Sequence, residues 1–351
     1  MLIRRGHLMK IIAAFSSDSR EQYKADIFKT LSLQNGDTVH FRYKKKYIDP
    51  QIYQQRKSMI GNDVYIFFTQ NNNDGNDDLI HKSIRRAKII AFDWSEMTEL
   101  YHVRMILDDF IDAKIVNAGD KSRFLKYIEC SEEDKYSNWK SRIEDVRKSF
   151  PDLIFFNIDG IYNSKGIAVK PKYNHQSKGC YYEVYHGERY TLNIRIANPN
   201  DSKYKLLLNS TPDDVVIAHC NPVESSVQYD DIFVPLNIKT VPFFKHSNFL
   251  TYQITNKKNE LPIKNESFDD TPPSIDKGFD LYTVSQELCL KLNLKNAAGF
   301  GFLCVLAFLA LTFAGDKTPV AAAAWPYVKV IFSSVLIFLS TTGLFYFFNK
   351  K

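Results

Sequence analysis

The chain has 351 residues, of which 44% are hydrophobic and 25% are charged, and its 46 basic and 40 acidic side chains leave a net charge of +6. This small surplus excludes the concentrated basicity of a dedicated nucleic-acid binder, so sequence-specific binding of nucleic acid is disfavoured. It suits a chain that works near anionic lipid or a phosphate-bearing ligand. About 290 residues precede the last apolar runs, which is enough for two ordinary domains.

Residues 9–150 are predicted to form an N-terminal α+β or β-rich domain, which we interpret as sensing a signal or binding a partner. Aromatic and β-branched runs predict strands at 11–15, 38–43, 64–69, 84–92 and 100–106. Apolar residues at helical spacing predict helices at 19–31 and 134–147. The polar stretch at 71–78, NNNDGNDD, predicts a loop.

Within this domain, the segment 40–47, HFRYKKKY, interleaves aromatic with basic side chains. Aromatic faces stack on bases and cations pair with phosphates, so a nucleotide, an oligonucleotide or a lipid headgroup is a candidate ligand. The alternative, which we favour, is an edge strand with its rings in the core and its lysines in water, protected against aggregation. The candidate ligand-binding residues are Arg42, Tyr43, Lys44, Lys46, Arg85 and Arg86.

Residues 172–255 are predicted to form an immunoglobulin-like β-sandwich, because short strands recur between turn residues. The predicted strands are 180–184, 189–196, 204–208, 215–218, 232–236 and 249–254. The core tryptophan of antibody domains is missing, so only the architecture is predicted. Residues 256–296 are interpreted as a linker and juxtamembrane segment, in which the leucines around Leu288 fit either a last strand or a helix.

Residues 297–349 are predicted to form a transmembrane helical hairpin. The uncharged apolar runs 297–315 and 330–348 are each long enough to cross a bilayer as a helix. Trp325 and Tyr327, in the connection, have the amphipathic chemistry of interface anchors. The predicted fold is therefore a multidomain α+β or β-rich soluble region with an immunoglobulin-like β-sandwich, followed by a C-terminal two-helix transmembrane hairpin.

Small and hydroxyl-bearing residues are concentrated in the two predicted spans. They let helices approach closely, and in an assembly of several hairpins they are suited to lining a water-filled path. We therefore expect a homo-oligomer. The candidate assembly residues are Gly299, Gly301, Ser333, Ser334, Ser340, Thr341, Thr342 and Gly343.

The charges that flank the spans predict their orientation. Lysines precede the first run and follow the second, which favours cytoplasmic N- and C-termini. The start of the chain has only a short apolar patch and is not expected to act as a signal peptide. We therefore expect a multi-pass protein of the cell membrane with two spans. The five dispersed cysteines fit reduced thiols.

Catalytic and metal-binding motifs are not found in the sequence. It has no G-x-S-x-G elbow, no phosphate-binding glycine loop followed by lysine, no H-E-x-x-H and no cysteine pair at zinc spacing. The histidines are scattered through different predicted elements. We therefore expect a protein that is not an enzyme and that needs no cofactor or metal.

A large body followed by a minimal two-helix hairpin resembles, in layout, the membrane effectors of bacterial anti-phage systems. The resemblance implies a membrane-anchored cytosolic recognition protein whose hairpins assemble to disrupt the inner membrane. The expected partners are the lipid bilayer, further copies of the chain, and a cytosolic protein or nucleotide-type ligand. Two other functions stay open: a passive membrane-tethered scaffold, and a membrane-bound enzyme with an unrecognised active site in residues 9–150.

Overall fold

The computed structural model divides the chain into two compact units, Met1–Lys291 and Leu292–Lys351. The structure describes residues 8–70, 79–132, 138–151, 153–175, 179–198, 204–211, 216–218, 224–225, 229–239, 247–256 and 282–291. In these residues no helix is both long and apolar enough to cross a bilayer. The predicted hairpin, its assembly residues from Gly299 to Gly343 and the anchors Trp325 and Tyr327 lie outside them, as does the predicted loop at 71–78.

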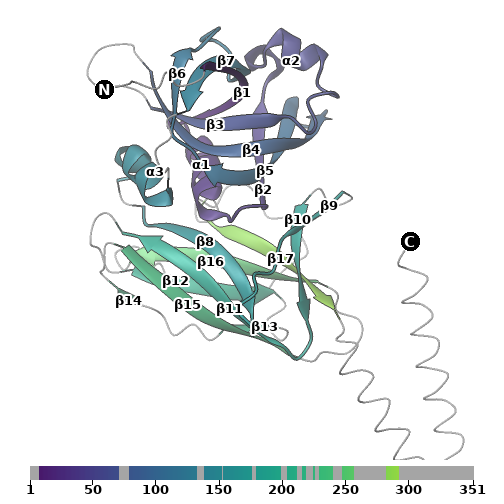
Figure 1. The fold of residues 1–351 in the computed structure, drawn as a ribbon, viewed down its shortest axis with the longest axis vertical. Coiled ribbons are helices and arrows are strands. Elements are labelled where there is room, and N and C mark those ends of the chain that lie inside the picture. Colours follow the sequence, from purple (N-terminus) through teal and green to yellow (C-terminus); the bar gives the residue numbers. More distant parts are fainter. Residues whose placement is uncertain are drawn as a thin grey trace, which may run out of the picture. The chain divides into compact units, whose positions relative to one another are not determined.

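The described chain is mostly β-structure, arranged in three sheets (Figure 1). The first sheet has seven strands in the order β2-β5-β4-β3-β1-β7-β6, and its β1–β3 pair is parallel. The five strands predicted in this part are confirmed, and β6 and β7 are additional. The bounds are β1 Leu8–Ser17, β2 Thr38–Tyr43, β3 Asp63–Gln70, β4 Ile80–Ser95, β5 Leu100–Phe110, β6 Ala113–Asn117 and β7 Leu125–Glu132.

The seven-stranded sheet curls around its own core. Alternate residues of its strands, such as Ile12 and Ile66, are buried on one face in a large apolar cluster. The chain after β2 reaches β7, where the backbone N–H of Asp49 donates to the carbonyl of Leu125 over 2.8 Å, and Ile48 forms a parallel bridge with Leu125. The sheet is therefore a partly closed barrel. The opposite face of β1, β3 and β7 carries a second, smaller apolar cluster.

Three short α-helices accompany this sheet: α1 Glu21–Ser32, α2 Pro50–Gln54 and α3 Trp139–Val146. The predicted helix at 19–31 corresponds to α1 and is confirmed, because Ile27, Phe28 and Leu31 fall on one buried face. The second predicted helix corresponds to α3, which begins after Asn138, whose side chain accepts a hydrogen bond from the Ser141 N–H. Single 3₁₀ turns lie at Lys45–Tyr47 (η1) and Arg147–Ser149 (η2).

The other two sheets lie in the second half of the described chain. One has the order β14-β12-β16-β17-β10-β9, and the other has the order β13-β15-β11-β8. All six strands predicted between 172 and 255 are confirmed. The bounds are β8 Phe155–Asn163, β9 Lys172–Asn174, β10 Gly179–Tyr185, β11 Arg189–Ala197, β12 Tyr204–Thr211, β13 Val216–Ala218, β14 Glu224–Ser225, β15 Tyr229–Ile238, β16 Ser247–Asn256 and β17 Val284–Lys291.

These two sheets share one apolar core. Alternate residues of β15 and β17 are buried, and the ring of Phe156 from the four-stranded sheet stacks 6.3 Å from that of Tyr252 in the six-stranded sheet. Two of the strands, β8 and β17, lie outside the predicted range 172–255. Leu288 belongs to β17, so the strand interpretation of its alternating pattern is the one that the structure confirms.

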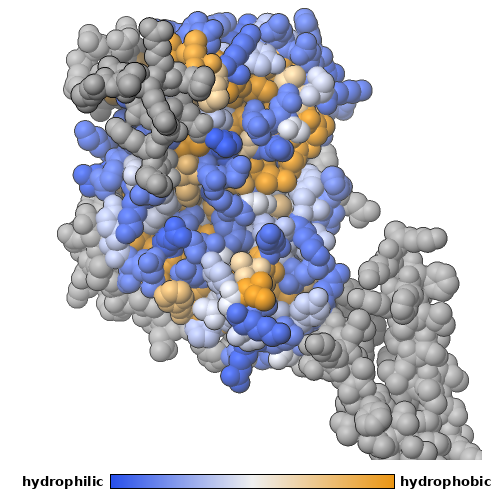
Figure 2. All heavy atoms as spheres, in the orientation of Figure 1, coloured by the Kyte–Doolittle hydropathy of each residue, from blue (hydrophilic) through white to orange (hydrophobic). Residues whose placement is uncertain are grey.

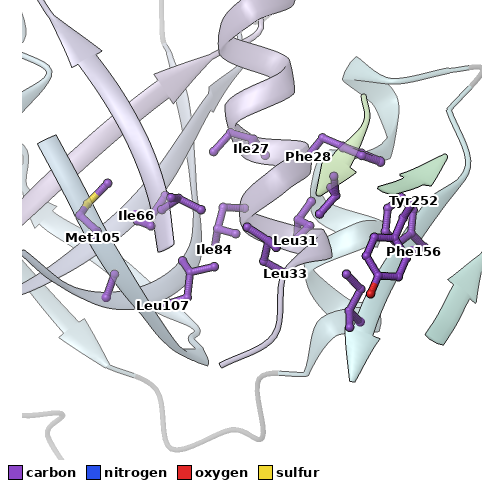
Figure 3. Close-up of a cluster of buried hydrophobic side chains, with 14 of the residues drawn as sticks. Ile27, Phe28, Leu31, Leu33, Ile66, Ile84, Met105, Leu107, Phe156 and Tyr252 are labelled. Atoms are coloured by element: carbon purple, nitrogen blue, oxygen red, sulfur yellow. The ribbon is translucent and has the colours of Figure 1, made fainter. Parts of the chain in front are cut away.

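Helix α1 joins the barrel core to the core of these two sheets, and Figure 3 shows its apolar side chains between them. Phe28 packs edge-to-face on Phe156 with ring centres 5.4 Å apart, while Leu31 and Ile84 are fully buried beside it. Burying each of these large side chains contributes about 1.5–3 kcal/mol. The barrel and the two sheets are therefore parts of one folded unit.

A buried hydrogen-bonded network lies at the same junction. The Gln286 amide in β17 donates to the carboxylate of Asp37 over 2.8 Å and to the Tyr182 hydroxyl over 3.0 Å. Tyr252 donates to the Gln286 carbonyl oxygen over 2.6 Å, and Gln34 donates to Tyr182. Burial raises the pKa of Asp37 to about 6. Polar groups of the barrel and of the two sheets after it satisfy each other's hydrogen bonds here, so the junction has one defined geometry.

We predict that a chain ending at Lys291 folds, whereas a chain ending at Asp276 does not. The shorter chain lacks β17, which pairs with both β10 and β16 and buries Leu288. Losing those pairs exposes apolar surface on both neighbours. Thermal unfolding followed by circular dichroism should show a cooperative transition for the longer chain alone. A cooperative transition at the same temperature in both would contradict the placement of β17.

We also predict a pH effect for Asp37→Asn. The native pKa of about 6 exceeds the ordinary aspartate value of 3.8, so the stabilisation linked to Asp37 is full below about pH 4 and is lost as the pH rises through 6. A shift of this size corresponds to about 3 kcal/mol. In urea unfolding of the chain ending at Lys291, the variant should lose less stability than the parent between pH 4 and pH 7. Equal losses would contradict the prediction.

Candidate functional site

A pocket of about 300 Å³ opens beside the second apolar cluster, on the face of the curled sheet opposite the barrel core. Its walls come from β1, from the facing ends of β3 and β4, and from β6, β7 and the loop between them. Its lining combines apolar side chains with three cations, all of which come from the β6–β7 loop and the start of β7. The lining residues are Phe15, Thr69, Leu79, His81, Ile115, Val116, Ala118, Lys121, Arg123, Phe124 and Lys126.

The loop between β6 and β7 is held by the carboxylate of Asp120. This carboxylate accepts hydrogen bonds from the backbone N–H of Ser122 over 2.8 Å and from Arg123 Nε over 3.3 Å. The hydrogen bonds from Ser122 hold the pKa of Asp120 below its usual range. Gly119 permits the turn with a φ of +61°. The loop therefore presents Lys121 and Arg123 at the pocket in a fixed backbone geometry.

Lys126 is the buried cation of the pocket, with 3% of its surface exposed. Its ammonium donates to the backbone carbonyl of Asp120 over 3.0 Å and lies 4.8 Å from the centre of the Phe15 ring. Burial lowers the pKa of Lys126, while the charge of Asp120 opposes this shift. A buried ammonium whose contacts are a carbonyl and a ring is stabilised when an anion is brought next to it.

His81 adds a neutral polar group. Its Nδ1 lies 2.9 Å from the Thr69 hydroxyl, and its ring meets Phe15 edge-on with centres 5.0 Å apart. Burial, together with the nearby charges of Lys126 and Lys121, lowers the pKa of His81 to about 4. The imidazole is therefore neutral at pH 7 and can donate or accept one hydrogen bond at Nε2.

The pocket combines an apolar wall with three cations, and its described lining carries no carboxylate. This chemistry suits a small anion with an apolar or planar part, and the volume is at the lower end of the range for small-molecule sites. Arg and Lys are the usual partners of phosphate. Among the described residues, no group of three or more His, Cys, Asp or Glu side chains is placed to hold a metal ion.

Four of the predicted ligand-binding residues lie on β2 and the turn after it. Arg42 pairs with Asp26 over 3.2 Å, and the buried Tyr43 donates its hydroxyl hydrogen to the carbonyl of Phe15 over 3.1 Å. Lys44 and Lys46 are exposed. The structure thus ties Arg42 and Tyr43 into the fold and leaves the two lysines at the surface.

The other two predicted ligand-binding residues lie on β4. Arg85 is 1% exposed, and its Nη1 donates to the carbonyls of Thr30 and Leu33 at the end of α1 over 2.8 and 2.6 Å. Burial lowers the pKa of Arg85 to about 9. Arg86 stands over the Tyr65 ring at 5.6 Å. Arg85 is therefore not on a surface shared with Lys44 and Lys46.

The turn at Lys45–Tyr47 is connected to the pocket. The Arg123 guanidinium donates to the carbonyl of Lys46, and the ring of Tyr47 packs edge-to-face on Phe124 at 5.1 Å. The segment 40–47 is predicted from the sequence as a ligand-binding candidate or an edge strand, and the pocket loop is not predicted. The available signal was the stretch 121–126, KSRFLK, which mixes cations with an aromatic residue as HFRYKKKY does.

Comparison with known proteins gives no relative from which a function can be transferred. No protein-family model and no curated protein matches this chain. The geometry of the described residues is therefore the basis for the functional argument.

Proposed function

We propose that this protein is a membrane-anchored recognition protein whose pocket binds a small phosphate-bearing ligand of nucleotide type. The observation that carries the proposal is the set of three cations, Lys121, Arg123 and Lys126, around an apolar wall. A phosphate placed among them replaces the carbonyl and ring contacts of Lys126 with a charge-assisted hydrogen bond. The Phe15 and Phe124 rings provide apolar surface for the rest of the ligand.

The C-terminal sequence supports the anchoring part of the proposal. The sequence has two uncharged apolar runs of spanning length, and the first begins at Ala297, a short connection after β17. In this proposal they form a hairpin with both ends in the cytoplasm, and several copies assemble through their small and hydroxyl-bearing residues to disrupt the inner membrane. The layout is that of bacterial anti-phage membrane effectors, and the role in defence rests on that analogy.

The region between pocket and hairpin supports a transmitting role. The two sheets that follow the barrel have the two-layer packing and mostly antiparallel pairing of an immunoglobulin-like sandwich, which we propose as their type. Helix α1 and the Asp37 network join them to the barrel without a flexible link. A conformational change in the barrel therefore alters the packing around β17, the last described strand before the proposed hairpin.

We predict that Lys121→Glu combined with Arg123→Glu weakens binding of AMP and inorganic pyrophosphate at least tenfold. Each lost charge-assisted contact costs about 1.5–3 kcal/mol, and the new carboxylates repel the ligand. Isothermal titration of the full chain in detergent measures the change. Lys165→Glu with Lys170→Glu is the matched control, because both lysines are exposed in the turn after β8. Equal affinities for the pocket variant and this control would refute the pocket.

We predict that induced expression of the full chain depolarises bacterial cells that supply the ligand, while the chain ending at Lys291 does not. A membrane-potential dye reports the effect, and the pocket variant should lower it. If the full chain leaves the potential unchanged although the purified protein binds AMP or pyrophosphate, the effector role fails and a passive scaffold replaces it. Turnover of the bound probe would instead favour the enzyme.

A further inference from the structure

A group of aromatic and cationic side chains, of which Lys45 and Trp94 are exposed, lies outside the pocket, where α2 meets the β4–β5 hairpin. We call it the aromatic platform, and it consists of Lys45, Tyr53, Arg56, Trp94 and Tyr101. Trp94 is 47% exposed, although a large aromatic side chain usually gains from burial. Figure 2 shows hydrophobic residues among hydrophilic ones on one face of the barrel, so exposed apolar surface is a feature of this body.

The rings of the platform support one another. Trp94 and Tyr101 are opposite each other on β4 and β5, with ring centres 4.7 Å apart. Tyr101 is buried and meets Tyr53 edge-on at 5.4 Å, and its hydroxyl donates to that of Tyr53 over 3.2 Å. Trp94 is therefore held from beneath while its outer face stays open to a planar group.

The cations of the platform are positioned by the same rings. Lys45 Nζ lies 4.5 Å from the centre of the Tyr53 ring, and the Arg56 guanidinium carbon lies 5.1 Å from it. Arg56 also donates to the carbonyl of Tyr53 over 3.2 Å. Two cations are thus held over Tyr53, whose ring meets Tyr101 beneath the exposed Trp94. Such a group of rings and cations can take bases on the rings and phosphates on the charges.

The platform continues into the pocket through the turn at Lys45–Tyr47. Lys45 contacts Tyr53 of the platform, and the next residue, Lys46, stands 4.9 Å over the ring of Tyr47. Tyr47 packs on Phe124, which lines the pocket. A series of contacting rings and cations, which we call the track, therefore runs from Trp94 to the pocket, and such a mixture suits a polymer of bases and phosphates.

We propose that this track binds a short single-stranded oligonucleotide without sequence preference, with one base stacked on Trp94 and its phosphates paired with Lys45 and Arg56. The inference deepens the proposed function, because it rests on the pocket as the place of a further phosphate. Glu96 and Glu99, at the tip of the β4–β5 hairpin, repel a polyanion and mark where the track ends. The few cations of the track agree with the small net charge of the chain.

The test uses the full chain in detergent and a fluorescein-labelled oligo(dT) of about six nucleotides, a length that one binding domain can hold. Trp94→Ala should weaken binding about tenfold or more, since stacking of one base contributes about 1–3 kcal/mol. Lys45→Ala with Arg56→Ala should reduce the slope of log K against log salt by about 1.4, because two phosphate contacts are removed. Fluorescence anisotropy measures both quantities.

Two control variants separate the platform from general surface effects. Phe233→Ala removes an exposed aromatic ring that is 65% exposed on β15, and Lys165→Ala removes an exposed cation of the turn after β8. Both should bind the oligonucleotide as the parent does. If the platform variants also bind as the parent does, or if the parent does not bind, the proposal is overturned. It is equally overturned if Trp94 is needed only for binding to phosphatidylglycerol vesicles.

The pocket variants distinguish this proposal from the proposed function. If AMP or pyrophosphate binds in a way that depends on Lys121 and Arg123, but the parent protein does not bind the oligonucleotide, the pocket is supported and the track is refuted. Oligonucleotide binding that depends on Trp94 and Lys45, with no effect of Lys121→Glu on AMP, would keep the platform and refute the pocket. Loss of both ligands in the matching variants supports the two together.

Discussion

The end of helix α1 is the constraint on which the rest of the described structure depends. The last carbonyls of a helix have no partner within it, and here they point into the interior. Arg85 of the barrel donates to the carbonyls of Thr30 and Leu33, while Asn157 of β8 donates to that of Leu31 over 2.9 Å. An unsatisfied buried carbonyl costs about 1–3 kcal/mol. If the barrel or the sheets after it moved away from α1, these carbonyls would therefore lose their hydrogen-bond donors.

This constraint also explains why the pocket lies where it does. The face of the curled sheet that holds the main core is filled by side chains that include those of α1 and α2, and the pocket opens on the opposite face. There Phe15 belongs to the second, smaller apolar cluster, and Phe124 packs against it. Cations on the β6–β7 loop complete a polar rim around it. The two faces of this sheet therefore differ, because one is filled by the main core and the other borders the pocket.

Much of the fold was predictable, because local patterns determine strands such as β3 and β11, whose apolar residues alternate or run together between turns. The bounds of the second half of the described chain were not predictable, because β8 and β17 lie far from one another in sequence and join the sheets only through tertiary pairing. Arg85 is predicted to be a ligand-binding cation because the sequence does not show that the carbonyls at the end of α1 accept hydrogen bonds from its guanidinium. The pocket is not predicted because its residues come from four separate stretches of the chain.

The position of β17 also has a consequence for the order of events during synthesis. It is the last described strand to leave the ribosome, yet it lies between β16 and β10 and pairs with both. The six-stranded sheet therefore stays open, with two unpaired edges, until residues up to 291 have emerged. Those residues immediately precede the first apolar run. The six-stranded sheet is therefore completed only shortly before the first of the two apolar runs of the sequence emerges.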